Sequence, residues 1–114
     1  MNICIFNGDM SRGGGTERIT QILANGLCEQ ANYEIYVLNL NNDSGKSFYP
    51  LNENIHFVVL NSAGIKKKII ELRHFLKKES IDILINVDVM LGIYSLPATF
   101  LQNKTKIISW EMFN

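Results

Sequence analysis

Cysteine is nearly absent from this sequence of 114 residues, which contains only Cys4 and Cys28. A small secreted domain held together by disulfides would have more cysteine than this. Both residues fall within apolar patterns, where a free thiol behaves as a small hydrophobic side chain. We therefore expect reduced cysteines and a cytoplasmic location.

A net charge is also absent, because 11 lysine and arginine residues balance 11 aspartate and glutamate residues. A protein that binds nucleic acid through bulk attraction carries an excess of positive charge, so we expect no nucleic-acid partner. The charge is unevenly spread, however. Residues 1–60 have three basic and six acidic side chains, whereas residues 61–114 have eight basic and five acidic.

Long apolar runs are missing as well. No run approaches the length of about 18 residues that a membrane-spanning helix needs, and no charged-then-apolar leader opens the chain. We expect neither a membrane span nor an export signal. Apolar residues still make up 46% of the sequence, which is enough for a packed core, and the length predicts a single domain over residues 1–114.

What the sequence does contain is a glycine-rich stretch between a strand pattern and a helix pattern. The apolar run of residues 3–6 predicts a buried strand, and residues 7–18, NGDMSRGGGTER, lead into a helical pattern. Backbone N–H groups at such a helix N-terminus lack partners and attract anions. We expect a phosphate to bind against Gly14, Gly15 and Thr16; the alternative is a flexible turn.

Neither standard nucleotide motif fits this loop. In the dinucleotide pattern G-x-G-x-x-G, Gly13 and Gly15 fill the first two positions but Arg18 stands at the third. Gly8 and Gly13 have P-loop spacing, yet glycines follow where the pattern needs Lys and then Ser or Thr. A phosphate site here would be of another kind.

Strand and helix patterns alternate along the rest of the chain. Apolar runs predict further strands over residues 34–40, 55–60, 83–85 and 106–110. Helical periodicity follows the glycines, covers residues 65–79, and runs from residue 89 to about residue 101 with a break at Pro97. This alternation predicts the α/β class: a Rossmann-like three-layer domain with a mainly parallel sheet in the order 3-2-1-4-5. The connector over residues 41–54 lacks a helical pattern, so the direction of the third strand stays open.

The two longer helices have amphipathic patterns. The predicted core stripe of the first comprises Ile19, Ile22, Leu23, Gly26 and Leu27. That of the second comprises Ile65, Ile69, Leu72 and Leu76, and its opposite side carries Lys66, Lys67, Lys68, Arg73, Lys77 and Lys78. This basic face is either an ordinary solvated surface or a peripheral contact with anionic lipid at the inner face of the cell membrane.

Polar residues follow the predicted fourth strand. Asn86 and Asp88 stand at its carboxyl end, where open α/β sheets place their binding residues. Asp88 has a second interpretation as the N-cap of the next helix. The glycine loop, these residues and the segment after Trp110 should share one rim of the sheet.

The sequence resembles the N-terminal domain of glycosyltransferase family 4, a group with the GT-B fold. Members commonly open with a strand, then Gly-Gly-x-Glu-Arg, then a helix with Leu-Ala and a later Leu. The matching residues are 14–18 (GGTER), 23–24 (LA) and Leu27. The resemblance continues through residues 33–38 and 81–86 and ends at residues 110–114 (WEMFN), where relatives often have His after the Glu.

The resemblance implies a retaining transfer of sugar from a nucleotide-sugar donor to a saccharide or lipid-linked acceptor. It places Gly14, Gly15 and Thr16 beside the donor and Glu111 and Met112 in the cleft, with no metal and no cofactor. Met112 departs from the usual His, so any role of that His is lost or moved. Because the donor-binding domain of such enzymes is not in these residues, we expect a fragment that is inactive alone.

The rival prediction is a non-enzymatic flavodoxin-like regulator or ligand-binding module. A receiver-type regulator needs several acidic residues after the first strand and a Lys after the fifth, but Asp9 stands alone and Trp110 follows Ser109. A further expectation concerns the fifth strand, which would form an exposed sheet edge. We expect a homodimer through this edge together with Trp110 and Phe113.

Overall fold

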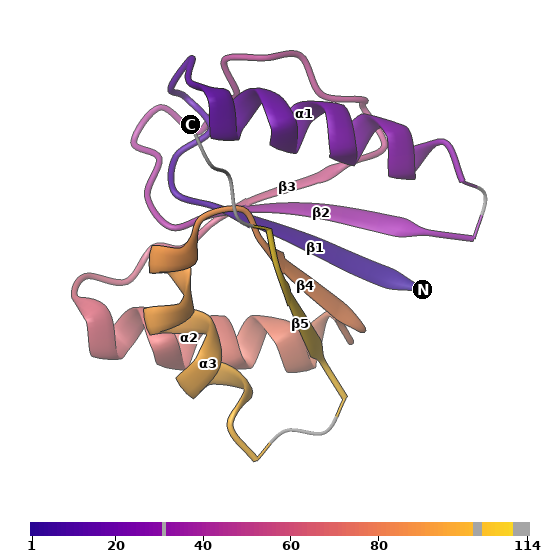
Figure 1. The fold of residues 1–114 in the computed structure, drawn as a ribbon. Coiled ribbons are helices and arrows are strands. Elements are labelled where there is room, and N and C mark those ends of the chain that lie inside the picture. Colours follow the sequence, from indigo (N-terminus) through magenta and orange to yellow (C-terminus); the bar gives the residue numbers. More distant parts are fainter. Residues whose placement is uncertain (31, 102–103, 111–114) are drawn as a thin grey trace.

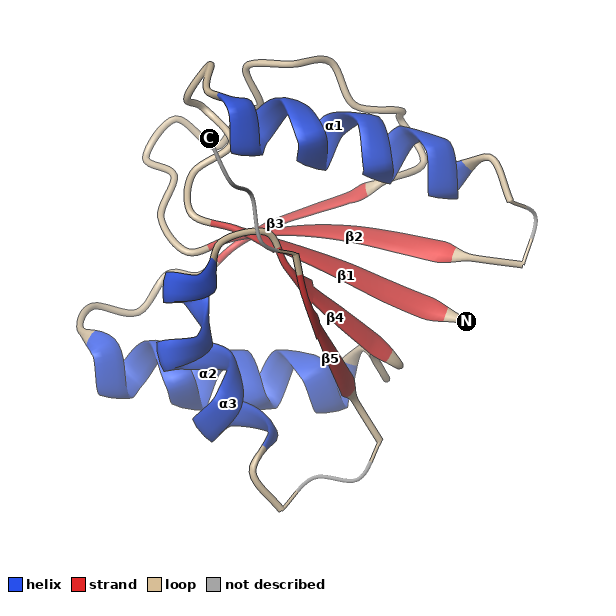
Figure 2. Ribbon diagram, viewed as in Figure 1, coloured by secondary structure: helices blue, strands red, loops and turns tan. Residues whose placement is uncertain are grey.

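The computed structural model describes residues 1–30, 32–101 and 104–110, which form a five-stranded sheet with helices on both faces (Figures 1 and 2). The strands are β1 (Asn2–Asn7), β2 (Glu34–Asn39), β3 (His56–Val59), β4 (Ile83–Asn86) and β5 (Lys106–Ser109). The helices are α1 (Gly15–Cys28), α2 (Ile65–Lys78), the short 3₁₀ helix η1 (Val89–Leu91) and α3 (Gly92–Thr99).

The sheet confirms the predicted class and strand order. Its order is β3-β2-β1-β4-β5, and all four pairings are parallel. The direction of β3, which the sequence left open, is therefore parallel: Tyr36 lies opposite His56, and Asn39 lies opposite Val59. A flavodoxin-like sheet has the strand order 2-1-3-4-5, which differs from the observed order. The fold therefore does not support the rival prediction of a flavodoxin-like module.

The layers follow from the apolar strands. α1 covers one face of the sheet, and α2 with α3 covers the other (Figure 2). β1 and β2 are almost wholly buried, because each lies between two neighbouring strands and beneath helices. The core side chains with less than 2% exposure include Ile5, Phe6, Leu38, Leu72 and Leu84.

The connector between β2 and β3 forms an irregular crossover, as its sequence suggests. It runs along α1 and is held there by side chains rather than by a helix of its own. Gln21 and Asn25 donate hydrogen bonds to the carbonyl oxygen of Pro50 at 3.0 and 3.1 Å, and Asn25 accepts one from the N–H of Asn52 at 2.8 Å. These polar contacts, together with the packing of Leu51 against the core, hold the crossover in place without a helix.

The predicted core stripe of α1 is only partly right: Leu23 and Leu27 pack against the core, but Ile22 and Gly26 do not. Ile22 is 57% exposed, and Gly26 lies in open space without close neighbours. The buried residues are instead Glu17, Thr20 and Ala24. Two of these are polar. Thr20 is hydrogen-bonded to Asn7 at the carboxyl end of β1, and Glu17 is hydrogen-bonded to Gly14 and Thr16 at the start of the helix. These contacts turn the buried side of the helix away from its most apolar side.

The predicted faces of α2 need a similar correction. Leu72 and Leu76 are buried as expected, but Ile65 is 55% exposed. Lys68, predicted to lie on the solvated basic face, is only 8% exposed, and its Nζ donates to the carbonyl oxygen of Leu40 at 2.9 Å. Lys68 therefore belongs to the sheet-facing side of the helix.

The break in the last helical region also differs from the prediction. It falls between η1 and α3, whereas Pro97 lies inside the last turn of α3. No helix in the described part of the chain has the length and apolar character needed to cross a bilayer.

Candidate functional site

The carboxyl ends of β1, β2 and β4 each carry an asparagine that is almost completely buried: Asn7, Asn39 and Asn86 are at most 1% exposed. Because the strands are parallel, these residues meet at one rim of the sheet, on the left in Figure 1. Ligands of open α/β sheets bind at this rim. The glycine loop, Asn86 and Asp88 lie on it as predicted.

Asn7 and Asn39 position the loop after β1. The amide nitrogen of Asn7 donates to Thr20 Oγ1 at 2.8 Å, and its oxygen accepts from the N–H of Asp9 at 3.1 Å. Asn39 Oδ1 accepts from the N–H of Met10 at 2.8 Å. Buried amides of this kind fix the backbone because leaving any of their groups unpaired is costly.

Glu17 closes the N-terminus of α1 from within. Its Oε1 accepts from the N–H of Gly14 at 3.0 Å, and its Oε2 accepts from Thr16 Oγ1. A Cβ on Gly14 would lie 2.8 Å from Glu17 Oε1, so a larger residue here would push the Glu17 carboxylate out of its capping position. The capping role of Glu17 was not predicted, although glutamate at the third position of a helix is a recognised capping signal.

The contacts of Glu17 limit how an anion can bind at the glycine loop. Of the predicted donor groups, the N–H of Gly14 is already hydrogen-bonded, which leaves Gly15 and Thr16 at the start of the helix. The Glu17 carboxylate also places a negative charge where the helix dipole would favour a phosphate. A ligand at this loop must therefore displace Glu17 or approach from one side.

Asn86 and Asp88 take different roles at the end of β4. Asp88 caps η1, since its Oδ1 accepts from the N–H of Met90 at 3.0 Å; the N-cap interpretation is confirmed. Asn86 donates to Ser95 Oγ at 2.8 Å, while its Oδ1 is buried without a partner among the described residues. An unpaired buried oxygen of this kind costs about 1–3 kcal/mol.

β5 brings the end of the described chain to the same rim. Ser109 lies opposite Asn86, and the N–H of Trp110 donates to the carbonyl oxygen of Asn86 at 2.7 Å. The predicted cleft residues Glu111 and Met112, and Phe113 of the expected dimer contact, lie outside the described residues.

Other reactive side chains lie away from this rim. Burial raises the pKa of the Cys4 thiol far above its ordinary value, so it is an inert core residue. His56 is exposed, lies with its Nε2 3.1 Å from a Glu34 carboxylate oxygen, and stacks on Tyr36. The described residues contain no cluster of His, Cys, Asp and Glu that could hold a metal ion.

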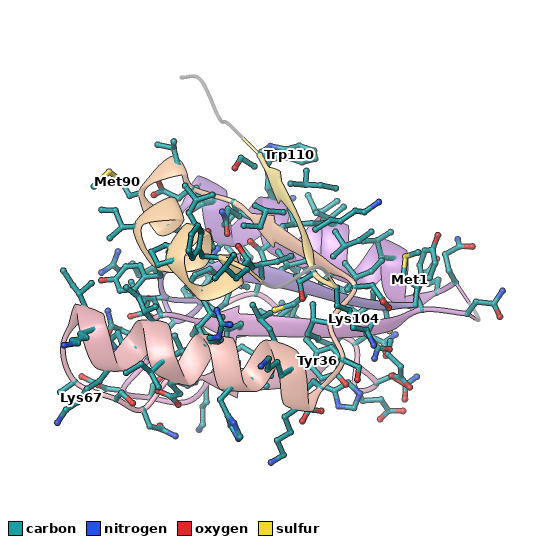
Figure 3. The ribbon with its side chains drawn as sticks, turned by 90° about the horizontal axis from the view of Figure 1, so that it is seen from below. Met1, Tyr36, Lys67, Met90, Lys104 and Trp110 are labelled. Atoms are coloured by element: carbon teal, nitrogen blue, oxygen red, sulfur yellow. The ribbon has the colours of Figure 1, made fainter. Side chains whose placement is uncertain are left out.

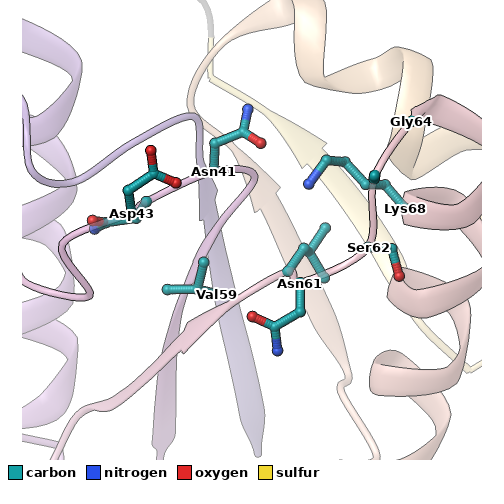
Figure 4. A pocket seen from close by; sticks show the side chains of 10 residues that line it. Asn41, Asp43, Val59, Asn61, Ser62, Gly64 and Lys68 are labelled. Atoms are coloured by element: carbon teal, nitrogen blue, oxygen red, sulfur yellow. The ribbon is translucent and has the colours of Figure 1, made fainter.

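A pocket of about 490 Å³ does open at the rim, between the ends of β2 and β3 and the N-terminus of α2. It was not predicted, because its central side chain is Lys68, which the helical pattern placed in solvent. Figure 4 shows the ammonium end of Lys68 extending from α2 across this pocket toward Asn41.

The comparisons with known proteins bear on the fold. No protein-family model matches the chain, and no curated protein does. Among solved structures, the apo form of the lipopolysaccharide outer core galactosyltransferase WaaB matches with a TM-score of 0.68 and 21% sequence identity. The match covers 96% of this chain and 33% of that one, so the chain spans about a third of its length. The Rossmann-like fold that the family resemblance implies is thus confirmed: the chain folds like part of a glycosyltransferase.

Proposed function

We propose that the protein is the N-terminal, acceptor-side part of a retaining glycosyltransferase. The full enzyme moves a sugar from a nucleotide-sugar donor to a saccharide or lipid-linked acceptor, and these residues alone are inactive. No metal or cofactor takes part, and the enzyme works in the cytoplasm. The observation that carries the proposal is the fold match to a galactosyltransferase over 96% of the chain.

The local structure supports the same function. The glycine loop lies at the carboxyl end of the central strand, and its Gly14 leaves room for the Glu17 carboxylate to cap the helix. Gly15 and Thr16 present the first N–H groups of α1 toward the rim. A sugar diphosphate needs such backbone donors and space for close approach, whereas a structural turn needs neither.

Amide NMR shifts on titration with UDP-galactose and GDP-mannose test the proposal. Binding should shift the amides of Gly13, Gly15 and Thr16 and leave those of α2 unchanged. Affinity should be weak, because an exposed anion gains only about 0.3–1 kcal/mol from a helix dipole. Galactose and mannose without the nucleotide provide the matched controls. Shifts confined to the amino ends of the strands would contradict the proposed function.

A further inference from the structure

The pocket beside α2 has walls from three segments. Residues 41–43 form one side, residues 59–64 form another, and Lys68 closes it from the helix. Two further hollows of about 470 Å³ lie elsewhere, one at the amino ends of β2 and β3 and one along the outer edge of β3. Only the first of these three opens at the carboxyl rim of the sheet, where a substrate would meet the glycine loop.

Lys68 is the unusual residue of this pocket. Lysine is rarely this buried unless it is paired with an acid. Among the described residues no carboxylate lies within salt-bridge distance of Lys68, and the nearby Glu71 carboxylate, which its charge influences, is occupied by the N–H groups of Asn61 and Ser62. Its ammonium group has three N–H donors, and the carbonyl oxygen of Leu40 accepts one of them. Its other two donors make no hydrogen bond to a described residue, and the ammonium group lies at the pocket (Figure 4).

The rest of the pocket supplies both charge and hydrogen-bonding groups. The N-cap of α2 is Gly64, which has no capping side chain, and the first turn has no acidic residue, so its N–H groups add to the positive potential. The side chains of Asn41, Asp43 and Asn61 also line the pocket. None of these three side chains makes a hydrogen bond to another described residue, so they are free to bind hydroxyl groups.

The walls are held in place before any ligand arrives. The Glu71 carboxylate accepts hydrogen bonds from the N–H groups of Asn61 and Ser62 at 2.8–3.0 Å. On the other side, the buried amide of Asn42 binds Asn39 Oδ1 at 3.2 Å and the carbonyl oxygen of Lys46 at 2.9 Å. A preorganised pocket loses little conformational entropy on binding.

We infer that this pocket binds an anionic sugar residue of the acceptor, with Lys68 and the start of α2 holding its carboxylate or phosphate. Asn41, Asn61 and Asp43 hold the hydroxyl groups; the Asp43 carboxylate accepts from them and disfavours an anion on its own side of the pocket. The inference rests on the proposed function, because the occupant is taken to be the acceptor.

Direct binding to the unsubstituted protein tests the inference. Glucuronate, glucose 6-phosphate, glucose and inorganic phosphate are titrated separately while amide shifts are followed. At least one anionic sugar should shift the amides of residues 41–43 and 61–65, and which one does so tells carboxylate from phosphate. Equal shifts from neutral glucose would overturn the inference. Equal affinity for inorganic phosphate alone would overturn its sugar part.

Three variants locate the charge. Lys68→Met should weaken binding of the anionic sugar about tenfold or more, since hydrogen bonds to charged groups are stronger than those between neutral groups. Lys66→Gln, on the exposed side of the same helix, should change it less than about twofold. Asp43→Asn, in an exposed loop, should strengthen binding because a like charge is removed. It keeps the inference testable if Lys68→Met fails to fold, because unchanged affinity in Asp43→Asn would then overturn it. Unchanged affinity in a folded Lys68→Met would overturn it as well.

The two proposals can fail separately. Nucleotide-sugar shifts at the glycine loop without anionic-sugar shifts at the pocket would overturn only the pocket assignment. Anionic-sugar shifts without any response of the glycine loop to nucleotide-sugars would leave an anionic-sugar site and overturn the donor part of the proposed function.

Discussion

Glu17 occupies, at the N-terminus of α1, part of the space that a bound anion needs. Its carboxylate binds the N–H of Gly14 and the hydroxyl of Thr16, and the side chain is only 6% exposed. The same residue thus stabilises the empty loop and opposes a diphosphate. At the residue scale, an internal carboxylate and an external anion therefore compete for the N-terminus of α1.

The substitution Glu17→Gln tests this competition. Removal of the charge should raise the affinity for UDP by roughly three- to tenfold, because a nearby like charge near a protein surface costs on the order of 1 kcal/mol. It should also lower the free energy of unfolding by about 1 kcal/mol, because charge-assisted capping bonds are the stronger ones. Amide titration and urea unfolding measure the two effects.

Glu29→Gln, at the exposed C-cap of the same helix, is the matched control and should change neither quantity. A fall in UDP affinity in Glu17→Gln would contradict the competition and would mean that the carboxylate itself contacts the nucleotide.

Glu71 gives the stability of the protein a defined pH dependence. Burial acts to raise the pKa of Glu71, but hydrogen bonds from Asn61 and Ser62 and the charge of Lys68 outweigh it, so the pKa lies below its ordinary value of 4.5. The stabilisation is therefore fully present above the unfolded-state pKa and is lost as the pH falls through the folded-state pKa.

We expect Glu71→Gln to be less stable than the unsubstituted protein at neutral pH and to lose less stability between about pH 5 and pH 3. Urea unfolding at several pH values measures this difference. Glu53→Gln, in the exposed connector, should keep the full pH dependence. Parallel stability curves for the Glu71 variant and the unsubstituted protein would show that this carboxylate does not hold the loop after β3.

At the scale of the elements, the apolar strands were predictable, whereas the buried faces of the helices were predictable only in part. β1, β2 and β4 are buried on both sides, so their uninterrupted apolar runs sufficed to place them and to indicate a parallel sheet. The buried sides of α1 and α2 depend on Thr20 and Lys68, which are buried because Asn7 and Leu40 bind them from distant parts of the chain. A periodicity that counts only apolar residues does not detect such contacts.

The candidate site was likewise predictable where it depends on the strands and not where it depends on a buried polar contact of a helix. The rim position of the glycine loop, Asn86 and Asp88 followed from strand order alone. The pocket did not, since it depends on a buried lysine whose only visible pattern is that of a solvated helix face. Glu111 and Met112 remain predictions that rest on the family resemblance.

The basic surface of α2 is now defined by Lys66, Lys67, Lys77 and Lys78, all of which are exposed; Figure 3 shows Lys67 extending from the helix into solvent. We propose that this surface binds anionic lipid. Replacing the four lysines by Gln should weaken binding to vesicles that contain phosphatidylglycerol, by about 1 kcal/mol for each lysine near the membrane.

Vesicle sedimentation at low and at physiological ionic strength measures the binding, which should decrease as the Debye length shortens to about 8 Å. Lys104→Gln with Lys106→Gln, on exposed residues at the start of β5, is the control. If the unsubstituted protein does not bind these vesicles at low salt, the surface is merely solvated.

At the scale of the whole molecule, the two edges of the described sheet are β3 and β5. The β5 edge exposes large apolar side chains, because Ile108 is 48% and Trp110 is 42% exposed. Figure 3 shows Trp110 at the end of β5. Unpaired strand groups beside exposed apolar side chains are templates for pairing with a second chain. We therefore propose that the protein self-associates through β5 as a symmetric dimer.

The substitution Ile108→Lys should raise the Kd of the dimer by roughly tenfold or more, because a charge on an edge strand blocks edge-to-edge pairing. The control is Ile22→Lys, at an apolar residue of α1 that is 57% exposed. It adds the same charge away from β5 and should leave the monomer–dimer equilibrium unchanged. Sedimentation velocity over a wide concentration range measures both. A protein that stays monomeric at high concentration would contradict the dimer, and equal effects of the two variants would place the contact elsewhere than at β5.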